Sequence, residues 1–223
     1  MTYSGKTHDF LDDVLPGEDF RADIFSLVVG AWPKVKLPRG IRLEPRITGL
    51  LRRARSQEQE ARFTPDPPFF MNEEVKKRDP VTGKEIERTD VEIHLRHRYI
   101  RGQKPYFVFE SKRLNVSYGG AVRPDAHEYI GEGGMGHLLA DGYESVPNFN
   151  GMLAYVMDGN VATAKQAVER QLVNKFEVLQ LSGEAKIHSS ALMPAGSPHG
   201  ETRHSHGTAE FGIFHIFLSA ASG

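Results

Sequence analysis

Two neighbouring stretches with β-strand patterns restrict the fold of this chain most strongly. Residues 90–95 alternate polar with apolar side chains, the period-two pattern of a strand with one buried face. Residues 106–112, with the sequence YFVFESK, are aromatic and β-branched and end in charge. Gly102 and Pro105 mark a turn between the two stretches. The pattern predicts two strands that carry carboxylates on one polar face.

The flanking segments predict an α/β protein. Apolar residues at helical spacing indicate a helix from Glu44 to about Arg55, with Pro45 at its first turn. Glu44 stands on the buried edge of this helix and not on its arginine face. The other predicted elements are a strand over 69–75, a turn over 78–85, a helix around 126–139, a strand over 150–157, an amphipathic helix with the stripe Ala164, Ala167, Val168, Leu172, Phe176 and Leu179, and a last strand over 211–218. Residues 1–40 show no clear pattern.

Composition limits the class of protein. A length of 223 residues, with 39% hydrophobic residues, predicts one globular domain. No apolar stretch approaches the roughly 20 residues of a membrane span, and the first residues do not resemble a signal peptide, so we expect a cytoplasmic protein without a membrane partner. Cysteine is absent, which leaves carboxylates, carbonyls and imidazoles as possible metal ligands.

A net charge of −1 argues against a protein dedicated to nucleic acid, but the basic residues are clustered. One cluster contains Arg46, Arg52, Arg53 and Arg55, and a second contains Arg96, Arg98, Arg101 and Lys104. The candidate nucleic-acid contacts are Arg52, Arg53, Arg113, Arg203 and His204. The alternative is that these side chains are only solvated faces of a helix and a hairpin.

Strand alternation places Glu110 and Lys112 on one face and Ser111 on the other. Carboxylates from two adjacent strands would bind Mg²⁺ as hard oxygen ligands. The ion would polarise a phosphate, while the lysine orients water or stabilises negative charge. Asp90 and Glu92 compete for the place on the preceding strand, and we favour Asp90.

The Glu-x-Lys triplet alone has little specificity, because the chain also contains it at Glu74/Lys76 and Glu184/Lys186. Only Glu110/Lys112 ends an apolar strand and follows a strand with an acidic face. The strand context, and not the triplet, therefore carries the prediction.

Glu44 on a leading helix, Asp90 on a strand and FESK at 109–112 together resemble the restriction-endonuclease-like PD-(D/E)XK nuclease superfamily. The resemblance covers roughly residues 41–180 and rests on short motifs, and Thr89 stands where the family often has proline. It implies a mixed central sheet flanked by helices in αβββαβ order, with residues 1–40 as an extension and 181–223 as a C-terminal loop and strand. It also implies metal binding by Asp90, Glu110 and Glu44, and assistance to attack by Lys112.

The expected function is thus that of a Mg²⁺-dependent endonuclease, with Mn²⁺ as a possible substitute. The resemblance implies DNA ahead of RNA as substrate, and a role in prokaryotic defence or repair. A homodimer or a partner subunit would supply targeting. The alternative from another class is a non-catalytic nucleic-acid-binding or assembly subunit that keeps the nuclease fold.

Several features have competing interpretations. Glu44 could instead cap its helix or pair with an arginine. Histidines at 199, 204, 206 and 215 could bind zinc, although a polar loop without a fixed zinc spacing is favoured. GEGGMG at 131–136 lacks the strand and the lysine of a phosphate loop. Tyrosines 118, 129 and 143 could stack on bases or complete a core.

Overall fold

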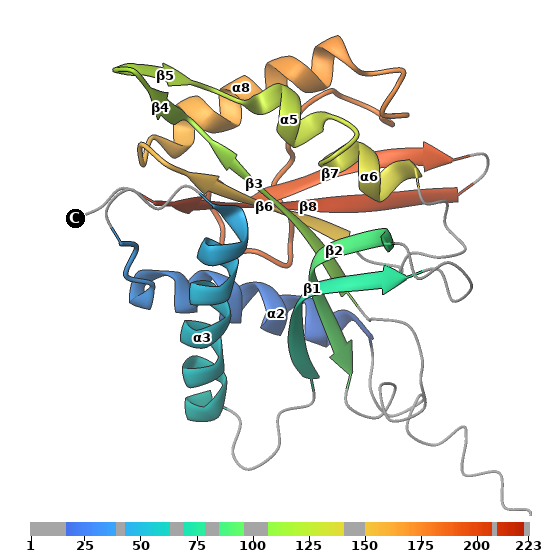
Figure 1. Cartoon of the computed structure of the whole chain (residues 1–223). Helices are drawn as coiled ribbons and strands as arrows, with labels where there is room; N and C mark the ends of the chain where they lie inside the picture. The colour runs from blue at the N-terminus through green and yellow to red at the C-terminus, as the bar shows by residue number, and fades with distance from the viewer. Residues whose placement is uncertain are drawn as a thin grey trace, which may run out of the picture.

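A computed structural model describes residues 17–38, 43–62, 69–78, 85–95, 107–140, 150–206 and 209–220. Its main feature is a six-stranded sheet in the order β1-β2-β3-β6-β8-β7 (Figure 1). The strands are β1 Phe69–Arg78, β2 Glu85–Leu95, β3 Phe107–Leu114, β6 Asn150–Val156, β7 Gly200–His206 and β8 Ala209–Ser219. β1, β2 and β3 are antiparallel, β6 is parallel to both β3 and β8, and β7 is antiparallel to β8. The sheet is therefore mixed, at the centre of an α/β fold.

Helices cover both faces of this sheet (Figure 1). The helices are α2 Gly17–Ala31, the short 3-10 helix η1 Trp32–Lys34, α3 Glu44–Arg62, α5 Ala126–Ile130, α6 Met135–Ala140 and α8 Val161–Asn174. α2 and α3 lie below the sheet in Figure 1, and α5, α6 and α8 lie above it. A hairpin of β4 Val116–Tyr118 and β5 Ala121–Arg123 follows β3 directly.

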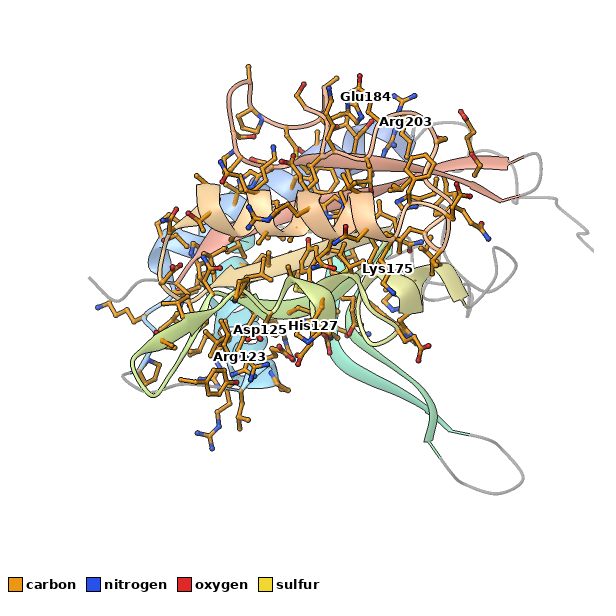
Figure 2. All side chains as sticks on the ribbon, turned by 90° about the horizontal axis from the view of Figure 1, so that it is seen from above. Arg123, Asp125, His127, Lys175, Glu184 and Arg203 are labelled. Atoms are coloured by element: carbon orange, nitrogen blue, oxygen red, sulfur yellow. The ribbon has the colours of Figure 1, made fainter. Side chains whose placement is uncertain are left out.

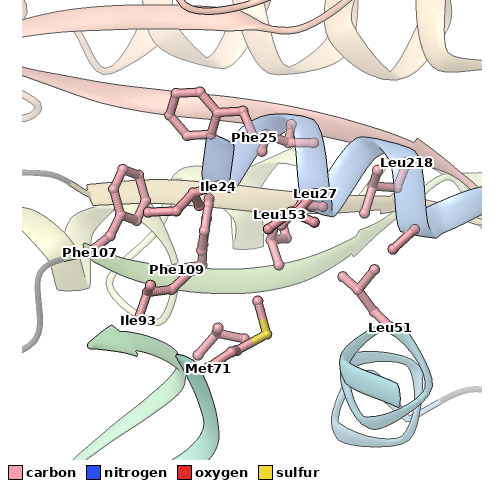
Figure 3. Close-up of a cluster of buried hydrophobic side chains, with 14 of the residues drawn as sticks. Ile24, Phe25, Leu27, Leu51, Met71, Ile93, Phe107, Phe109, Leu153 and Leu218 are labelled. Atoms are coloured by element: carbon pink, nitrogen blue, oxygen red, sulfur yellow. The ribbon is translucent and has the colours of Figure 1, made fainter. Parts of the chain in front are cut away.

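Each face of the sheet has its own apolar cluster. Figure 3 shows the cluster below the sheet, where Phe107 and Phe109 of β3 pack with Phe25 of α2 and Leu51 of α3. Val108 and Leu114 of the same strand point to the opposite face and join the cluster under α5 and α8. Because both faces are covered, β3 is buried along most of its length. Charged side chains on such a strand lose most of their contact with water.

Most predicted elements are confirmed, with shifted ends. The predicted helix begins at Glu44 as expected but continues to Arg62. The strand expected over 69–75 is β1, and it forms the predicted hairpin with β2, although residues 79–84 of the predicted turn lie outside the described residues. The strand and helix expected after residue 150 are β6 and α8, whose buried residues are Ala164, Ala167, Val168 and Leu172.

Two sequence interpretations are wrong. The helix expected around 126–139 is split into α5 and α6 by a turn over residues 131–134, and this turn requires glycine at 134, where a Cβ would lie 2.3 Å from the Tyr129 carbonyl oxygen. The histidine-containing segment is not a polar loop, since residues 200–206 form the edge strand β7. In addition, residues 17–31 form helix α2, which no pattern predicted. The second basic cluster, at residues 96–104, lies outside the described residues.

Two histidines belong to a hydrogen-bond chain in the core above the sheet. Tyr129 Oη lies 2.9 Å from His215 Nδ1, and Thr202 Oγ1 lies 2.9 Å from His215 Nε2 and 2.8 Å from His204 Nε2. His204 Nδ1 lies 2.7 Å from the Leu179 carbonyl oxygen, which only accepts. One set of neutral tautomers therefore satisfies the chain: Tyr129 donates to His215, His215 to Thr202, Thr202 to His204, and His204 to Leu179. A proton added to either histidine would face a hydroxyl group that already donates to that ring, so the arrangement would have to change.

Because of this hydrogen-bond chain, we expect the free energy of unfolding to decrease in mild acid. Burial lowers the pKa of His204 to about 4 and, together with the charges of His204 and Lys165, that of His215 to about 3. The unfolded chain binds protons near pH 6.5 and the folded chain does not, so stability falls as pH decreases below 6.5. Each histidine should cost about 2 kcal/mol between pH 6.5 and pH 5. Urea unfolding at the two pH values measures the loss.

Two variants test this assignment. His215→Phe removes one of the two buried titrations and should reduce the acid-induced loss. His127→Asn removes an exposed histidine and should leave the loss unchanged. The same pH dependence in wild type and His215→Phe would contradict the prediction.

Candidate active site

The adjacency on which the sequence prediction depends is confirmed, because β2 pairs directly with β3. Val91 is opposite Phe109 and Glu92 is opposite Val108 in this antiparallel pair. Asp90 immediately precedes Val91 and therefore lies next to the polar end of β3. Its Oδ2 accepts hydrogen bonds from Ser111 N at 2.8 Å and from Ser111 Oγ at 2.7 Å. Two donors from one residue fix this carboxylate against β3.

Glu110 and Lys112 share the upper face of β3, as alternation predicted. Lys112 Nζ donates to Glu110 Oε1 at 2.7 Å and to the Ser111 carbonyl oxygen at 3.0 Å. The side chain of Glu110 is 9% exposed and that of Lys112 is 15% exposed, so this ion pair is largely withdrawn from water. Removing one partner of such a pair leaves a poorly compensated charge.

Glu44 is brought to the same strand by helix α3. It is the first residue of the helix, and its Oε1 accepts from Arg113 N at 3.0 Å and from Arg113 Nε at 3.4 Å. The alternative interpretation, in which Glu44 pairs with an arginine, is therefore confirmed. The bond to the backbone of Arg113 also ties the start of α3 to the end of β3.

Electrostatics show that these groups influence one another. Burial raises the pKa of Glu110 to about 7; the negative charges of Asp90 and Glu44 add to this, and Lys112 opposes it. Burial alone would lower the pKa of Lys112, but Glu110, Asp90 and Glu44 outweigh it, so the Lys112 pKa lies above its usual value. At neutral pH Lys112 is a cation, and Glu110 is poised between its charged and neutral forms.

The carboxylates have suitable donor chemistry for a hard cation. Each uses one oxygen for the bonds above, and the other oxygen (Asp90 Oδ1, Glu110 Oε2, Glu44 Oε2) accepts no hydrogen bond among the residues that the structure describes. They do not yet converge: within the described residues, no group of three or more His, Asp or Glu side chains is arranged to hold a metal ion. The donor set fits Mg²⁺, and its side chains would have to turn toward one another.

Glu92, the rival of Asp90, occupies a different environment. It is 4% exposed, and its Oε2 lies 2.9 Å from His94 Nε2. Its other oxygen is buried without a hydrogen-bond partner. Asp90, and not Glu92, contacts the residue between Glu110 and Lys112, which supports the choice of Asp90.

The predicted basic residues do not all remain at the surface. Arg52 and Arg53 are exposed on α3, about 12 Å along the helix from Glu44. Arg113 is half-buried by its contact with Glu44. Arg55 is 4% exposed, and burial, followed by the charge of Arg52, lowers its pKa to about 10. Arg55 therefore belongs to the interior side of α3 and not to the basic surface.

The predicted contacts on the C-terminal segment are not brought to this site. His204 is fully buried in the chain with Thr202, so the prediction that it contacts nucleic acid is wrong for this conformation. Arg203 is exposed on β7, three strands and about 14 Å from β3. In Figure 2 it lies on the opposite side of the molecule from Arg123 of the β4–β5 hairpin. Sequence proximity to a histidine cluster could not reveal that β7 is the far edge strand.

The other sequence candidates contribute no second centre in the described residues. Glu184 and Lys186 form an exposed ion pair, and the side chains of Glu74 and Lys76 lie outside the described part. His199 Nδ1 accepts from Phe217 N at 3.2 Å, and His204 and His215 are held in the core chain. Tyr129 is buried, while Tyr118 is exposed with the Arg123 guanidinium 5.2 Å from its ring centre.

The structure adds three residues that sequence reasoning did not assign to the site: Ser111, Thr48 and Tyr155. Ser111 stands between the two predicted residues of its strand, and alternation alone placed it on the opposite face. Its backbone N–H nevertheless lies at the strand edge, where it reaches Asp90.

No helix in the described ranges has the length and apolar character needed to cross a membrane. Comparisons with protein-family models, curated proteins and solved structures find no match to this chain.

Proposed function

We propose that this chain is a metal-dependent nuclease that hydrolyses phosphodiester bonds. One observation carries the proposal: Asp90 and Glu110 lie on adjacent strands, and Glu110 is paired with Lys112 in a largely buried position. Burial of Glu110 within the sheet disfavours its charged form, and a catalytic use accounts for this arrangement better than stability does. The types and order of these residues also match the PD-(D/E)XK resemblance.

Asp90 and Glu110, with Glu44 from α3, would hold a Mg²⁺ ion. The bound ion would supply Lewis-acid polarisation of the phosphate and a lower pKa for an attacking water. Lys112 stays protonated, so it acts as a hydrogen-bond donor and positive charge, and not as a base. It would stabilise negative charge on the phosphate as the water oxygen bonds to phosphorus. The P–O ester bond breaks, the leaving oxygen takes up a proton, and the water's proton passes to solvent.

The topology supports a restriction-endonuclease-like core as part of the proposal. In chain order, α3 is followed by β1, β2 and β3, then by α5 and α6, and then by β6 parallel to β3. Apart from the β4–β5 hairpin between β3 and α5, this is the αβββαβ order expected from the resemblance, with β8 and β7 added at one edge. We also propose DNA as the substrate, a role in defence or repair, and targeting through a homodimer or a partner subunit in the cytoplasm.

A nuclease assay tests the proposal. The full chain is incubated with linear and supercoiled DNA, and separately with RNA, in Mg²⁺ or in EDTA. We expect DNA cleavage in Mg²⁺ only, and none with Asp90→Asn, which keeps the size of the side chain but removes its charge. Equal inactivity of the wild type and Asp90→Asn on every substrate would contradict the enzyme function.

One observation favours a second candidate, a non-catalytic nucleic-acid-binding subunit. The carboxylates within the described residues are not arranged around a common metal position. Binding of DNA with similar affinity by the wild type and Asp90→Asn, without cleavage by either, would favour this alternative.

A further inference from the structure

We infer that Thr48 and Tyr155 are positioning residues for Asp90, which they reach through a chain of buried hydroxyl groups; this inference rests on the proposed function. Tyr155 Oη lies 2.9 Å from Thr48 Oγ1, and Thr48 Oγ1 lies 3.4 Å from Ser111 Oγ. Ser111 Oγ donates to Asp90 Oδ2 at 2.7 Å. Tyr155, Thr48 and Ser111 are at most 2% exposed, so water does not compete for these bonds.

The direction of the chain follows from its two ends. The Asp90 carboxylate only accepts hydrogen bonds, so the Ser111 hydroxyl must donate its proton to Asp90. Ser111 then accepts from Thr48, and Thr48 accepts from Tyr155. Burial, with the nearby charges of Asp90 and Glu44, raises the pKa of Tyr155, so this phenol stays protonated and can donate. All hydroxyl dipoles therefore point toward the carboxylate.

The three hydroxyls come from three different elements. Tyr155 is on β6, Ser111 is on β3, and Thr48 is on α3. Thr48 lies one helical turn after Glu44, so the same side chain that supports Ser111 also sets α3 against the sheet at the point where Glu44 begins the helix. The chain of hydroxyl groups thus holds Asp90 Oδ2 and leaves Asp90 Oδ1 available. It also fixes the distance between the carboxylates of Asp90 and Glu44.

Trp32 packs against Tyr155 at the start of the hydroxyl chain. Its ring stacks on Tyr155 at 5.6 Å between ring centres with an angle of 18°, and its Nε1 donates to the Ser219 carbonyl oxygen at 2.6 Å. The ring of Tyr155 is therefore held in one position by this stacking. A preorganised supporting shell of this kind tunes metal-binding carboxylates in many proteins.

Three variants of the full chain test the inference. Thr48→Val removes the hydroxyl with little change of volume, Thr48→Ser keeps the hydroxyl, and Tyr155→Phe removes the donor at the start of the chain. The first readout needs no metal: the amide proton shift of Ser111, whose N–H donates to Asp90, measured by NMR. We expect the shift to change in Thr48→Val and Tyr155→Phe and to return to the wild-type value in Thr48→Ser.

The second readout is Mn²⁺ binding by calorimetry, with urea unfolding as a check on folding. Thr48→Val and Tyr155→Phe should raise the Mn²⁺ Kd by about tenfold, whereas Thr48→Ser should stay within about twofold of wild type. An unchanged Ser111 shift in both hydroxyl-deleted variants would overturn the inference whatever the metal does. A wild type that binds no Mn²⁺ while the shifts change as expected would instead contradict the proposed metal site.

Discussion

Replacing Lys112 by methionine is expected to lower the rate of Mg²⁺-dependent DNA cleavage by about a thousandfold, as losses of single charge-stabilising donors do in other enzymes. Methionine keeps the unbranched shape of the side chain, so the packing of β3 should persist. The positive charge beside Glu110 is lost, and with it the stabilisation of the phosphate as the water attacks. Initial rates on a fluorescently labelled duplex, at saturating Mg²⁺, measure the effect.

The chain provides a matched control for this change. Lys186 follows Glu184 with the same spacing, but that ion pair is exposed. Exposed pairs contribute little, so Lys186→Met should cleave at the wild-type rate. A similar loss in both variants, or none in Lys112→Met, would show that the buried position of Lys112 has no catalytic role.

This contrast shows what the sequence could and could not predict about the site. The triplet Glu-x-Lys occurs at both places, and the apolar strand before Glu110 was sufficient to choose between them. Strand alternation also placed Glu110 and Lys112 on one face. The choice between Asp90 and Glu92 depended on the register between β2 and β3, which is set by long-range pairing and not by local pattern.

The same distinction holds for the fold. Strongly periodic segments such as α8 and β6 were predicted, because their apolar residues repeat at the spacing of their own secondary structure. β7 was missed because its buried residues include Thr202 and His204, whose polarity suggested a loop. Their burial is possible only because each finds a partner on another segment, such as His215 or Leu179. Such pairing cannot be read from local hydropathy.

Burial of Glu110 also makes the stability of the fold depend on pH. Glu110 has a pKa of about 7, above the unfolded value, so the folded chain binds a proton that the unfolded chain releases between about pH 4.5 and 7. Its contribution to stability is therefore present at low pH and is lost as pH rises through 7. A cation that binds the charged carboxylate would remove this penalty. Stability and metal affinity should thus depend on the same proton.

Metal affinity is consequently expected to rise with pH until Glu110 has lost its proton. Mn²⁺ must displace that proton below pH 7, so the Kd should fall about tenfold for each pH unit from 5 to 7 and become constant above 8. Calorimetric titrations between pH 5 and 8.5 measure the Kd, and titrations in buffers of different ionisation enthalpy count the proton released.

Glu110→Gln separates this group from other titrating residues. Glutamine has nearly the same size but no ionisable proton, so this variant should bind Mn²⁺ more weakly at high pH and lose most of the pH dependence. Cleavage by the wild type should follow the same curve as binding, with its rate rising through about pH 7 as Glu110 becomes charged. A wild-type Kd that stays constant from pH 5 to 8, or an equally steep dependence in Glu110→Gln, would mean that Glu110 does not ligate the metal.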